Sequence, residues 1–365
     1  MNMSAILIAI ATAALLSLLI VPVAVRLGHR FNLLDLPVRH KRHKRPTPYT
    51  GGLALFAVFW LTIIVSTVMF DDAFGAYRDQ LPWVFVASLL ICIGGFLDDC
   101  YHLNEWKKLT IQIISAVILL AGGLKAQLLT TPSGSLELGW LAYPLTIAWV
   151  VMLTNAINII DGLDGLATGV SLIAACFMLV IGSHHDIGAI LVFVCALIGF
   201  LSVFWWHNKY PAKVFLGDSG SMQIGFLFAV ISLGHPLKSF TASALYLPML
   251  ALGVPILETV SSTIRRVSAG KSPMKADRRH LFHYLALAGL TPRQVVSVFY
   301  GLGLIFGGVS LAMLYWNRLI LLGILSVFML IVFGVFFVLI SMTLTRRRPD
   351  SGSDRPPGSR RTGRK

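Results

Sequence analysis

Apolar segments long enough to cross a lipid bilayer recur along the whole chain and limit what it can fold into. A spanning α-helix needs roughly 17 to 25 mostly apolar residues, because each residue advances the helix by about 1.5 Å. Such segments predict an all-α, polytopic helical membrane protein with about eleven spans. Two of the segments are short, and ten spans would remain if one is re-entrant or packed inside the bundle. The expected spans are 3–25, 51–70, 81–97, 109–124, 140–157, 166–182, 188–206, 219–234, 241–262, 295–314 and 319–342.

The composition agrees with a membrane protein and excludes an ordinary soluble domain. Hydrophobic residues make up 56% of the chain and charged residues 13%, and the mean hydropathy is +0.78. We expect residues 1–345 to form one integral-membrane domain. Residues 346–365 are rich in Arg, Pro, Gly and Ser, so they should form a disordered basic tail. The four cysteines lack metal-type spacing and are interpreted as packing residues.

The distribution of positive charge predicts the orientation in the membrane. Of the 30 Lys and Arg residues, all except Arg78, Lys125, Lys238 and Arg318 fall on one side of the expected spans. The positive-inside rule then places the N-terminus outside and the C-terminus in the cytoplasm. The first span has no basic residue before it and no cleavage site after it, so we expect it to be retained. The net charge of +14 reflects this topology and contact with membrane lipids, and it gives little support for nucleic-acid binding.

Amides and carboxylates gather at the end of the segment 140–157. Asn155, Asn158 and Asp161 are spaced by three residues, which makes successive members neighbours on a helix. A helix that ends near Gly162 would let Asp164 fold back beside Asp161. These oxygens would suit a hard cation such as Mg²⁺, whereas the plainer interpretation is a membrane helix capped by Asn and Asp.

Other polar groups lie in the expected cytoplasmic loops. Asp98 and Asp99 end one span, and adjacent carboxylates need a metal or a Lys as a partner. Asp218 lies between glycines and is either a functional acid or a helix N-cap. The loop from residue 265 to 283 clusters cations and histidines, which suits phosphate contacts. The loop 32–52 is basic and is punctuated by Pro and Gly, which indicates a fixed backbone beside an anionic head group.

Taken in order, these motifs resemble those of the polyprenyl-phosphate N-acetylhexosamine-1-phosphate transferases. The resemblance covers about residues 30 to 295. Within that superfamily the chain is most similar to the bacterial undecaprenyl-phosphate N-acetylglucosamine-1-phosphate transferases of the glycosyltransferase 4 type. The family's usual His-x-His-His motif is changed here, with Phe282 where a histidine is common. The motifs are Asp98-Asp99, Asn155-x-x-Asn158-x-x-Asp161-Gly-Leu-Asp164-Gly, Phe215-Leu-Gly-Asp218-Ser-Gly, Ser272-Pro273 to His280, and His280-x-x-His283.

The resemblance implies a role for each matching residue. Asp218 and Asn158 are expected to hold Mg²⁺, with Mn²⁺ as an alternative ion. Asp98, Asp99 and Asp161 are expected to be the catalytic carboxylates, the first two serving the lipid phosphate. The substrate-binding residues implied are Lys108 at the pyrophosphate, Asp164 and Phe215 at the uracil, and Arg279, His280 and His283 at the pyrophosphate or the sugar.

The expected activity is the transfer of N-acetylglucosamine 1-phosphate from UDP-N-acetylglucosamine to undecaprenyl phosphate, which releases UMP. This reaction would initiate a cell-envelope glycan of the O-antigen, enterobacterial common antigen or teichoic-acid type. We expect it at the cytoplasmic face of the bacterial inner membrane, and the sequence leaves a homodimer open. A phospho-N-acetylmuramoyl-pentapeptide transferase is the nearest alternative. A secondary transporter, which would place its acids near the middle of the bilayer, is the alternative of another class.

Overall fold

A computed structural model describes the fold. The structure describes residues 3–37, 45–126, 128–131, 134–183, 188–233, 252–268, 281–313, 315–316, 320, 323 and 326. The expected tail 346–365 and nearly all of the expected span 319–342 lie outside these residues. Arg279 and His280 also lie outside them.

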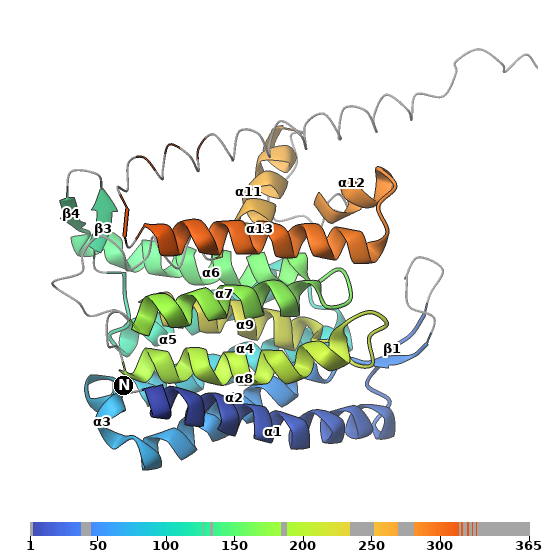
Figure 1. Cartoon of the computed structure of the whole chain (residues 1–365), viewed down its shortest axis with the longest axis horizontal. Helices are drawn as coiled ribbons and strands as arrows, with labels where there is room; N and C mark the ends of the chain where they lie inside the picture. The colour runs from blue at the N-terminus through green and yellow to red at the C-terminus, as the bar shows by residue number, and fades with distance from the viewer. Residues whose placement is uncertain are drawn as a thin grey trace, which may run out of the picture.

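Within the described residues the chain folds into a bundle of helices that run back and forth between two ends (Figure 1). The long helices coincide with nine of the expected spans, which confirms the all-α polytopic fold. Their bounds are α1 Met3–Arg30, α2 Gly51–Met69, α4 Leu81–Tyr101, α5 Glu105–Ala121, α6 Ala142–Ile160, α7 Leu166–Ser183, α8 Gly188–Asn208, α9 Gly217–Leu233 and α13 Pro292–Ala312. The shorter elements are β1 Leu34–Asp35, β2 Thr47–Pro48, α3 Asp71–Phe74, η1 Gly75–Tyr77, β3 Leu128–Thr131, β4 Gly134–Glu137, η2 Gly139–Leu141, α11 Gly253–Ser268 and α12 Leu281–Leu287.

Seven of the described helices are long and apolar enough to cross a membrane, namely α1, α2, α4, the η2–α6 segment, α7, α8 and α13. Helices α5 and α9 have 17 residues each and lie alongside them. The described part of the expected span 241–262 behaves differently. Its helix α11 ends at Ser268, beyond the expected boundary, and crosses the direction of the other helices steeply (Figure 1).

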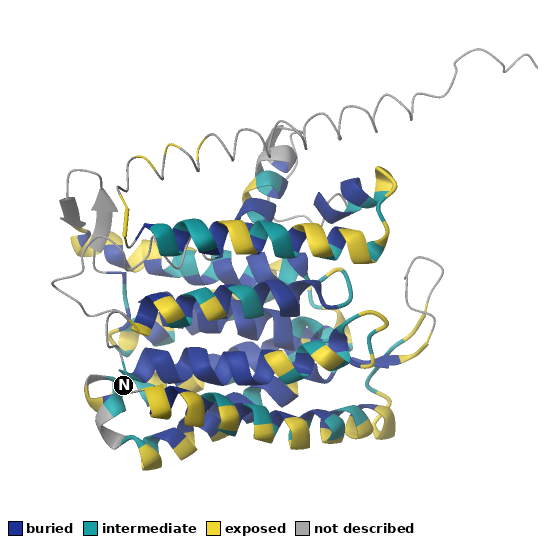
Figure 2. Cartoon of the chain, viewed as in Figure 1, coloured by how far each residue is buried: buried dark blue, intermediate teal, exposed yellow. Residues whose placement is uncertain are grey.

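Helix α9 forms the centre of the bundle. Every residue from Ser219 to Leu233 is buried, and the helix packs against α4, α6 and α2 (Figure 2). Of the two short segments expected from the sequence, 140–157 and 219–234, the second is therefore the one packed inside the bundle. Glycines permit this close packing, because a Cβ on Gly52 would overlap Gly220 and a Cβ on Gly95 would overlap Ser219.

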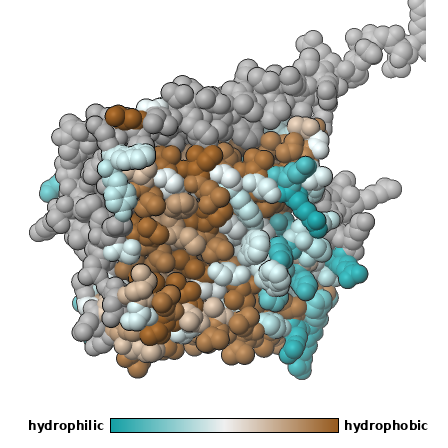
Figure 3. Space-filling model, viewed as in Figure 1, coloured by the Kyte–Doolittle hydropathy of each residue, from teal (hydrophilic) through white to brown (hydrophobic). Residues whose placement is uncertain are grey.

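The two ends of the bundle differ. One end carries the N-terminus, α3 and the antiparallel pair β3–β4. The sequence did not predict this strand pair. The other end carries β1–β2 and the turns that follow α4, α6 and α8, and we refer to it as the site end. On the face that Figure 3 shows, apolar side chains cover the middle of the bundle and hydrophilic ones gather at the site end.

The segment after α1 is fixed to the site end, as its Pro and Gly punctuation predicts. Leu34 pairs with Pro48 in the short β1–β2 ladder. The amides of Gly51 and Gly52 donate to the carbonyls of Phe215 and Leu216 at 3.0 and 2.9 Å. These bonds join the start of α2 to the start of α9, although residues 38–44 of the same loop lie outside the described part of the chain.

Candidate active site

A cavity of about 1140 Å³ lies at the site end and collects most of the expected functional residues. Among the residues that the structure describes, six aspartates line it, together with one lysine and one arginine, Lys209 and Arg293. The expected site residues in its wall are Asp98, Asp99, Asp161, Asp164, Phe215, Asp218 and His283. Lys108 and Asn158 are outside the wall and reach the site through Asp218.

Lys108 joins two carboxylates that come from different helices. Asp98 lies in the last turn of α4 and is 3% exposed, and Asp218 lies in the first turn of α9. The Lys108 ammonium is 2.8 Å from Asp218 Oδ2 and also contacts Asp98 Oδ2. One positive charge therefore faces two negative charges, and the cluster keeps an excess of negative charge.

Asp99 has a different environment from its neighbour Asp98. Its two carboxylate oxygens accept the backbone N–H groups of Asp218 and Ser219 at 2.7 and 3.1 Å. The first turn of a helix has N–H groups without intrahelical acceptors and a positive dipole end, which favour a carboxylate there, whereas burial and the nearby charge of Asp218 oppose its ionised form. Gly217 has φ +70°, and a Cβ on it would lie 2.6 Å from Asp99 Oδ2. Asp99 thus anchors the start of α9.

The two asparagines of the 155–164 motif have separate partners. Asn158 Nδ2 donates to Asp218 Oδ1 at 2.7 Å and to Ser221 Oγ at 2.9 Å. Asn155 instead exchanges hydrogen bonds with Gln112 of α5, at 2.7 and 3.3 Å. The sequence predicted one compact array of oxygen ligands, and for Asn155 this was wrong. Its side chain is held between α5 and α6, away from the carboxylates.

The turn after α6 carries the next two acids into the cavity wall. Asp161 follows the last residue of α6, and Asp164 Oδ2 accepts the N–H of Ala212 at 3.0 Å. Burial, together with the nearby carboxylates of Asp218, Asp99 and Asp164, raises the pKa of Asp161 to about 8. The expected end of the helix near Gly162 is confirmed, since α6 ends at Ile160. The turn that follows brings Asp161 and Asp164 to the same cavity.

Phe282 and His283 enter the wall from α12. The Phe282 ring is 4% exposed and lies against Gly162, where a Cβ would overlap its Cζ atom. Its centroid is 4.3 Å from that of His283. The aromatic residue at the position where histidine is common therefore packs on the turn that carries Asp161. Glu258 of α11 is buried and accepts the N–H of Leu281 at 3.0 Å, which fixes the start of α12.

Several residues of the wall were missed from the sequence. Lys209 holds its ammonium 3.1 Å from the centroid of Trp206, and Arg293 lies 5.1 Å above the ring of Tyr210. Trp205, Asn208 and Tyr300 also line the cavity. The run of aromatic and polar residues at positions 205–210 was the available signal for the α8 residues. The sequence carried no comparable signal for Tyr300, because this residue lies inside an apolar segment far along the chain.

The fold and this cavity define a multi-pass membrane protein with an acid-rich site where its helices end. Residues 81–235 match the model of glycosyl transferase family 4. A protein of Bacillus subtilis described as a "Probable undecaprenyl-phosphate N-acetylglucosaminyl 1-phosphate transferase" is 35% identical over 342 residues, which are 91% of this chain and 92% of that protein.

Two further relatives extend the comparison. The decaprenyl-phosphate N-acetylglucosaminephosphotransferase of Mycolicibacterium smegmatis is 32% identical over 302 residues, 75% of this chain and 73% of that one. A phospho-N-acetylmuramoyl-pentapeptide-transferase of Halalkalibacterium halodurans is 28% identical over 319 residues, 83% and 94% of the two chains. The chain belongs to glycosyl transferase family 4, and it is an enzyme of the polyprenyl-phosphate sugar-phosphate transferase class.

Proposed function

We propose that the protein transfers N-acetylglucosamine 1-phosphate from UDP-N-acetylglucosamine to undecaprenyl phosphate, giving undecaprenyl-diphospho-N-acetylglucosamine and UMP. The observation that carries the proposal is the position of the acidic cavity. It lies where the apolar bundle ends, so a lipid phosphate can enter while its polyprenyl tail stays in the bilayer. The names of the relatives from Bacillus subtilis and Mycolicibacterium smegmatis support N-acetylglucosamine as the sugar. We assign the reaction to the cytoplasmic face of the bacterial inner membrane, as the first step of a cell-envelope glycan.

The residues of the cavity divide between the two substrates. Phe215 and Asp164 take the uracil, and His283 borders the diphosphate or the sugar. Arg279 and His280, which lie outside the described residues, are assigned to the same group on the resemblance alone. Lys108 meets the diphosphate, because its ammonium already offsets the charges of two carboxylates and reduces the repulsion of an incoming anion.

The donor atoms fit Mg²⁺ in kind and in number. Among the residues that the structure describes, no three His, Cys, Asp or Glu side chains converge as ligands of one ion. Mg²⁺ does not need such a set, since it usually takes one or two carboxylates and completes its shell with waters and substrate phosphates. Asp218 and the amide oxygen of Asn158 would hold the ion, as proposed from the resemblance. Bound there, it would neutralise the charge of the diphosphate.

For the chemical step we favour direct transfer. An oxygen of the lipid phosphate attacks the β-phosphorus of the UDP-sugar, the bond to the α-phosphate oxygen breaks, and UMP leaves. A proton that remains on the lipid phosphate passes to Asp98. The second pKa of a phosphate monoester is about 6 in water, and the carboxylates of the site would raise it, so near neutral pH part of the bound lipid phosphate keeps a proton for Asp98 to accept. Both acids have partners, since Asp99 accepts two N–H groups at the start of α9, and Asp98 accepts the N–H of Leu103 at 2.6 Å and contacts Lys108. We propose Asp98 as the base.

The test uses purified full-length protein with Mg²⁺ and individual UDP-sugars, including the UDP-N-acetylmuramoyl-pentapeptide. UMP should appear only when a polyprenyl phosphate is added, and the mass of the lipid product identifies the sugar. A pentapeptide product would select the alternative transferase instead. Exchange of labelled UMP into UDP-N-acetylglucosamine without any lipid would indicate a covalent enzyme and overturn direct transfer.

The role of Asp98 has its own measurement. Asp98→Asn should slow transfer strongly near pH 7, and raising the pH should restore part of the rate by ionising the lipid phosphate. An Asp98→Asn enzyme with a normal rate at pH 7 would exclude this carboxylate as the base.

A further inference from the structure

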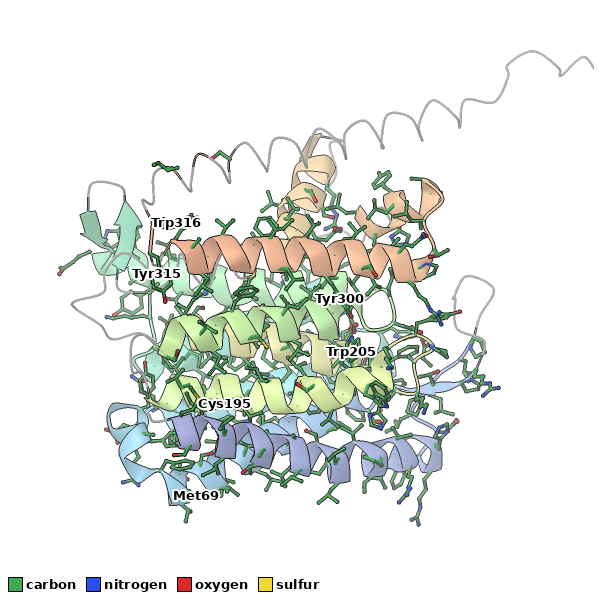
Figure 4. The ribbon with its side chains drawn as sticks, viewed as in Figure 1. Met69, Cys195, Trp205, Tyr300, Tyr315 and Trp316 are labelled. Carbon is green, nitrogen blue, oxygen red and sulfur yellow. The ribbon has the colours of Figure 1, made fainter. Side chains whose placement is uncertain are left out.

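Two helices that are far apart in the sequence hold one residue of the acidic turn. Tyr300 of α13 donates its hydroxyl to the carbonyl of Gly165 at 2.6 Å, and it accepts the indole N–H of Trp205 at 2.8 Å. On the other side of the turn, Asn208 Oδ1 accepts the N–H of Gly165 at 3.2 Å and the hydroxyl of Thr168 at 2.7 Å. Figure 4 labels Trp205 and Tyr300 beside one another in the half of the bundle nearer the site end.

Side chains thus bond to both polar backbone groups of Gly165, and its carbonyl also accepts the N–H of Gly169 at 2.9 Å. Gly165 has φ +77°, a conformation that residues other than glycine rarely adopt. Gly169, one helical turn further on, leaves room for the hydroxyphenyl group, because a Cβ there would overlap the hydroxyl of Tyr300. Asn208 is buried, and its Nδ2 donates to the carbonyl of Val214 at 2.9 Å. The turn is therefore fixed to α8 and α13 by a connected set of hydrogen bonds.

The turn is also the part of the wall that presents Asp161 and Asp164. Asp164 lies one residue before Gly165, and a backbone shift at Gly165 would move its carboxylate directly. Trp205 has no ionisable group and the phenol of Tyr300 is neutral near pH 7, so neither supplies charge to the substrates. Their contribution lies in the position of the turn.

We propose that Tyr300 and Trp205 are positioning residues, which hold the 161–165 turn so that Asp164 meets the nucleotide half of the sugar donor. The inference rests on the proposed function in one respect, the assignment of the nucleotide to Asp164. Tyr300 acts on the turn directly. Trp205 acts through Tyr300, because its indole N–H orients the phenol oxygen that bonds to Gly165. Polyprenyl phosphate has no contact with the turn in this scheme.

The kinetic test compares Tyr300→Phe, Trp205→Phe and the double variant in full-length enzyme. Loss of one hydrogen bond of this kind corresponds to a change of about tenfold. Tyr300→Phe should raise the KM for the UDP-sugar by about tenfold and leave the KM for polyprenyl phosphate within about twofold. Trp205→Phe should have a smaller effect of the same kind. When Trp205→Phe is added to Tyr300→Phe, the KM for the UDP-sugar should rise by less than about a further twofold, because the effects of two residues that act through one contact are not additive.

Trp149→Phe is the matched control. Trp149 is also partly buried and also donates its indole N–H to a hydroxyl, that of Ser232 at 2.7 Å, but it does not line the cavity. This variant should leave both KM values unchanged. Equal rises in the two KM values of Tyr300→Phe, or the same rise in Trp149→Phe, would indicate general destabilisation and overturn the proposal.

Hydrogen exchange provides a measurement that does not depend on the substrate. In Tyr300→Phe the amides of residues 161–169 should exchange faster than in the parent protein, and in Trp149→Phe they should not. Unchanged exchange in Tyr300→Phe would refute the positioning role even if the enzyme is active. The two proposals can fail separately. If Tyr300→Phe exchanges faster but the parent protein transfers no sugar phosphate from any UDP-sugar, the role of Tyr300 in holding the turn is supported and the proposed function is refuted.

Discussion

Replacing Asp99 by alanine tests the distinction between the two adjacent acids. The carboxylate of Asp99 accepts two backbone N–H groups at the start of α9, and Ser219, which provides one of them, is fully buried. Each buried donor that loses its acceptor costs about 1–3 kcal/mol, and the loss of a negative charge at a helix N-terminus costs a further 0.3–1 kcal/mol or so. For the two donors these costs add to about 2–7 kcal/mol, and relief of the repulsion between Asp99 and Asp218 offsets part of the sum, so Asp99→Ala should lower the free energy of unfolding by roughly 2–4 kcal/mol.

The assay is thermal unfolding of the purified full-length protein in detergent. The midpoint of Asp99→Ala should fall by several degrees. Asp99→Asn keeps one acceptor oxygen, so its unfolding midpoint should fall by about half as much as that of Asp99→Ala. Asp79→Ala is the control, because Asp79 is an exposed aspartate at the other end of the bundle. If Asp99→Ala and Asp79→Ala have the same midpoint, Asp99 does not anchor α9 and the separation of its role from that of Asp98 fails.

Three further predictions follow from the site and the topology. The pKa of Asp161, about 8, is above the usual value near 4, so in chelator-containing buffer its contribution to stability should fall as the pH rises from about 4 to about 8. Asp161→Asn should flatten the dependence of the unfolding midpoint on pH, and equal slopes in both proteins would contradict this. Gly162→Ala should reduce transfer, because its methyl group overlaps Phe282, and Phe282→Leu should restore part of the rate in the same chain. A topology reporter placed after Arg266 should lie in the cytoplasm and one placed at Ser183 outside, and finding both on one side would refute the orientation.

The helices and most of the aspartates in the described cavity wall could be predicted from the sequence, because both depend on local patterns. Apolar segments of spanning length locate the helices, and aspartates at their ends cost too much to be incidental. The partners of each acid could not be predicted. Asp98 and Asp99 are consecutive, yet successive residues of a helix point about 100° apart, so one faces Lys108 and the other faces the start of α9.

The same limit applies to residues that are distant in sequence. The three-residue spacing of Asn155 and Asn158 suggested one array, but the packing of α5 against α6 gave Asn155 a partner in Gln112. Tyr300 and Gly165 are 135 residues apart, and only the folded bundle brings them together. A hydrogen bond between such distant residues leaves no periodic signal in the chain.

The central place of α9 has a consequence for the order in which the protein is assembled. This helix carries Asp218 and is surrounded by α2, α4 and α6, all of which precede it in the chain. During synthesis these three neighbours of α9 are therefore made before α9 itself leaves the ribosome. With 17 residues, among them Gln223 and several serines, α9 is a weak candidate for insertion into lipid by itself. A helix of this kind can be inserted against partners that are already present. Asp218, which we propose to hold the cation, can therefore lie on a helix that does not face the lipid.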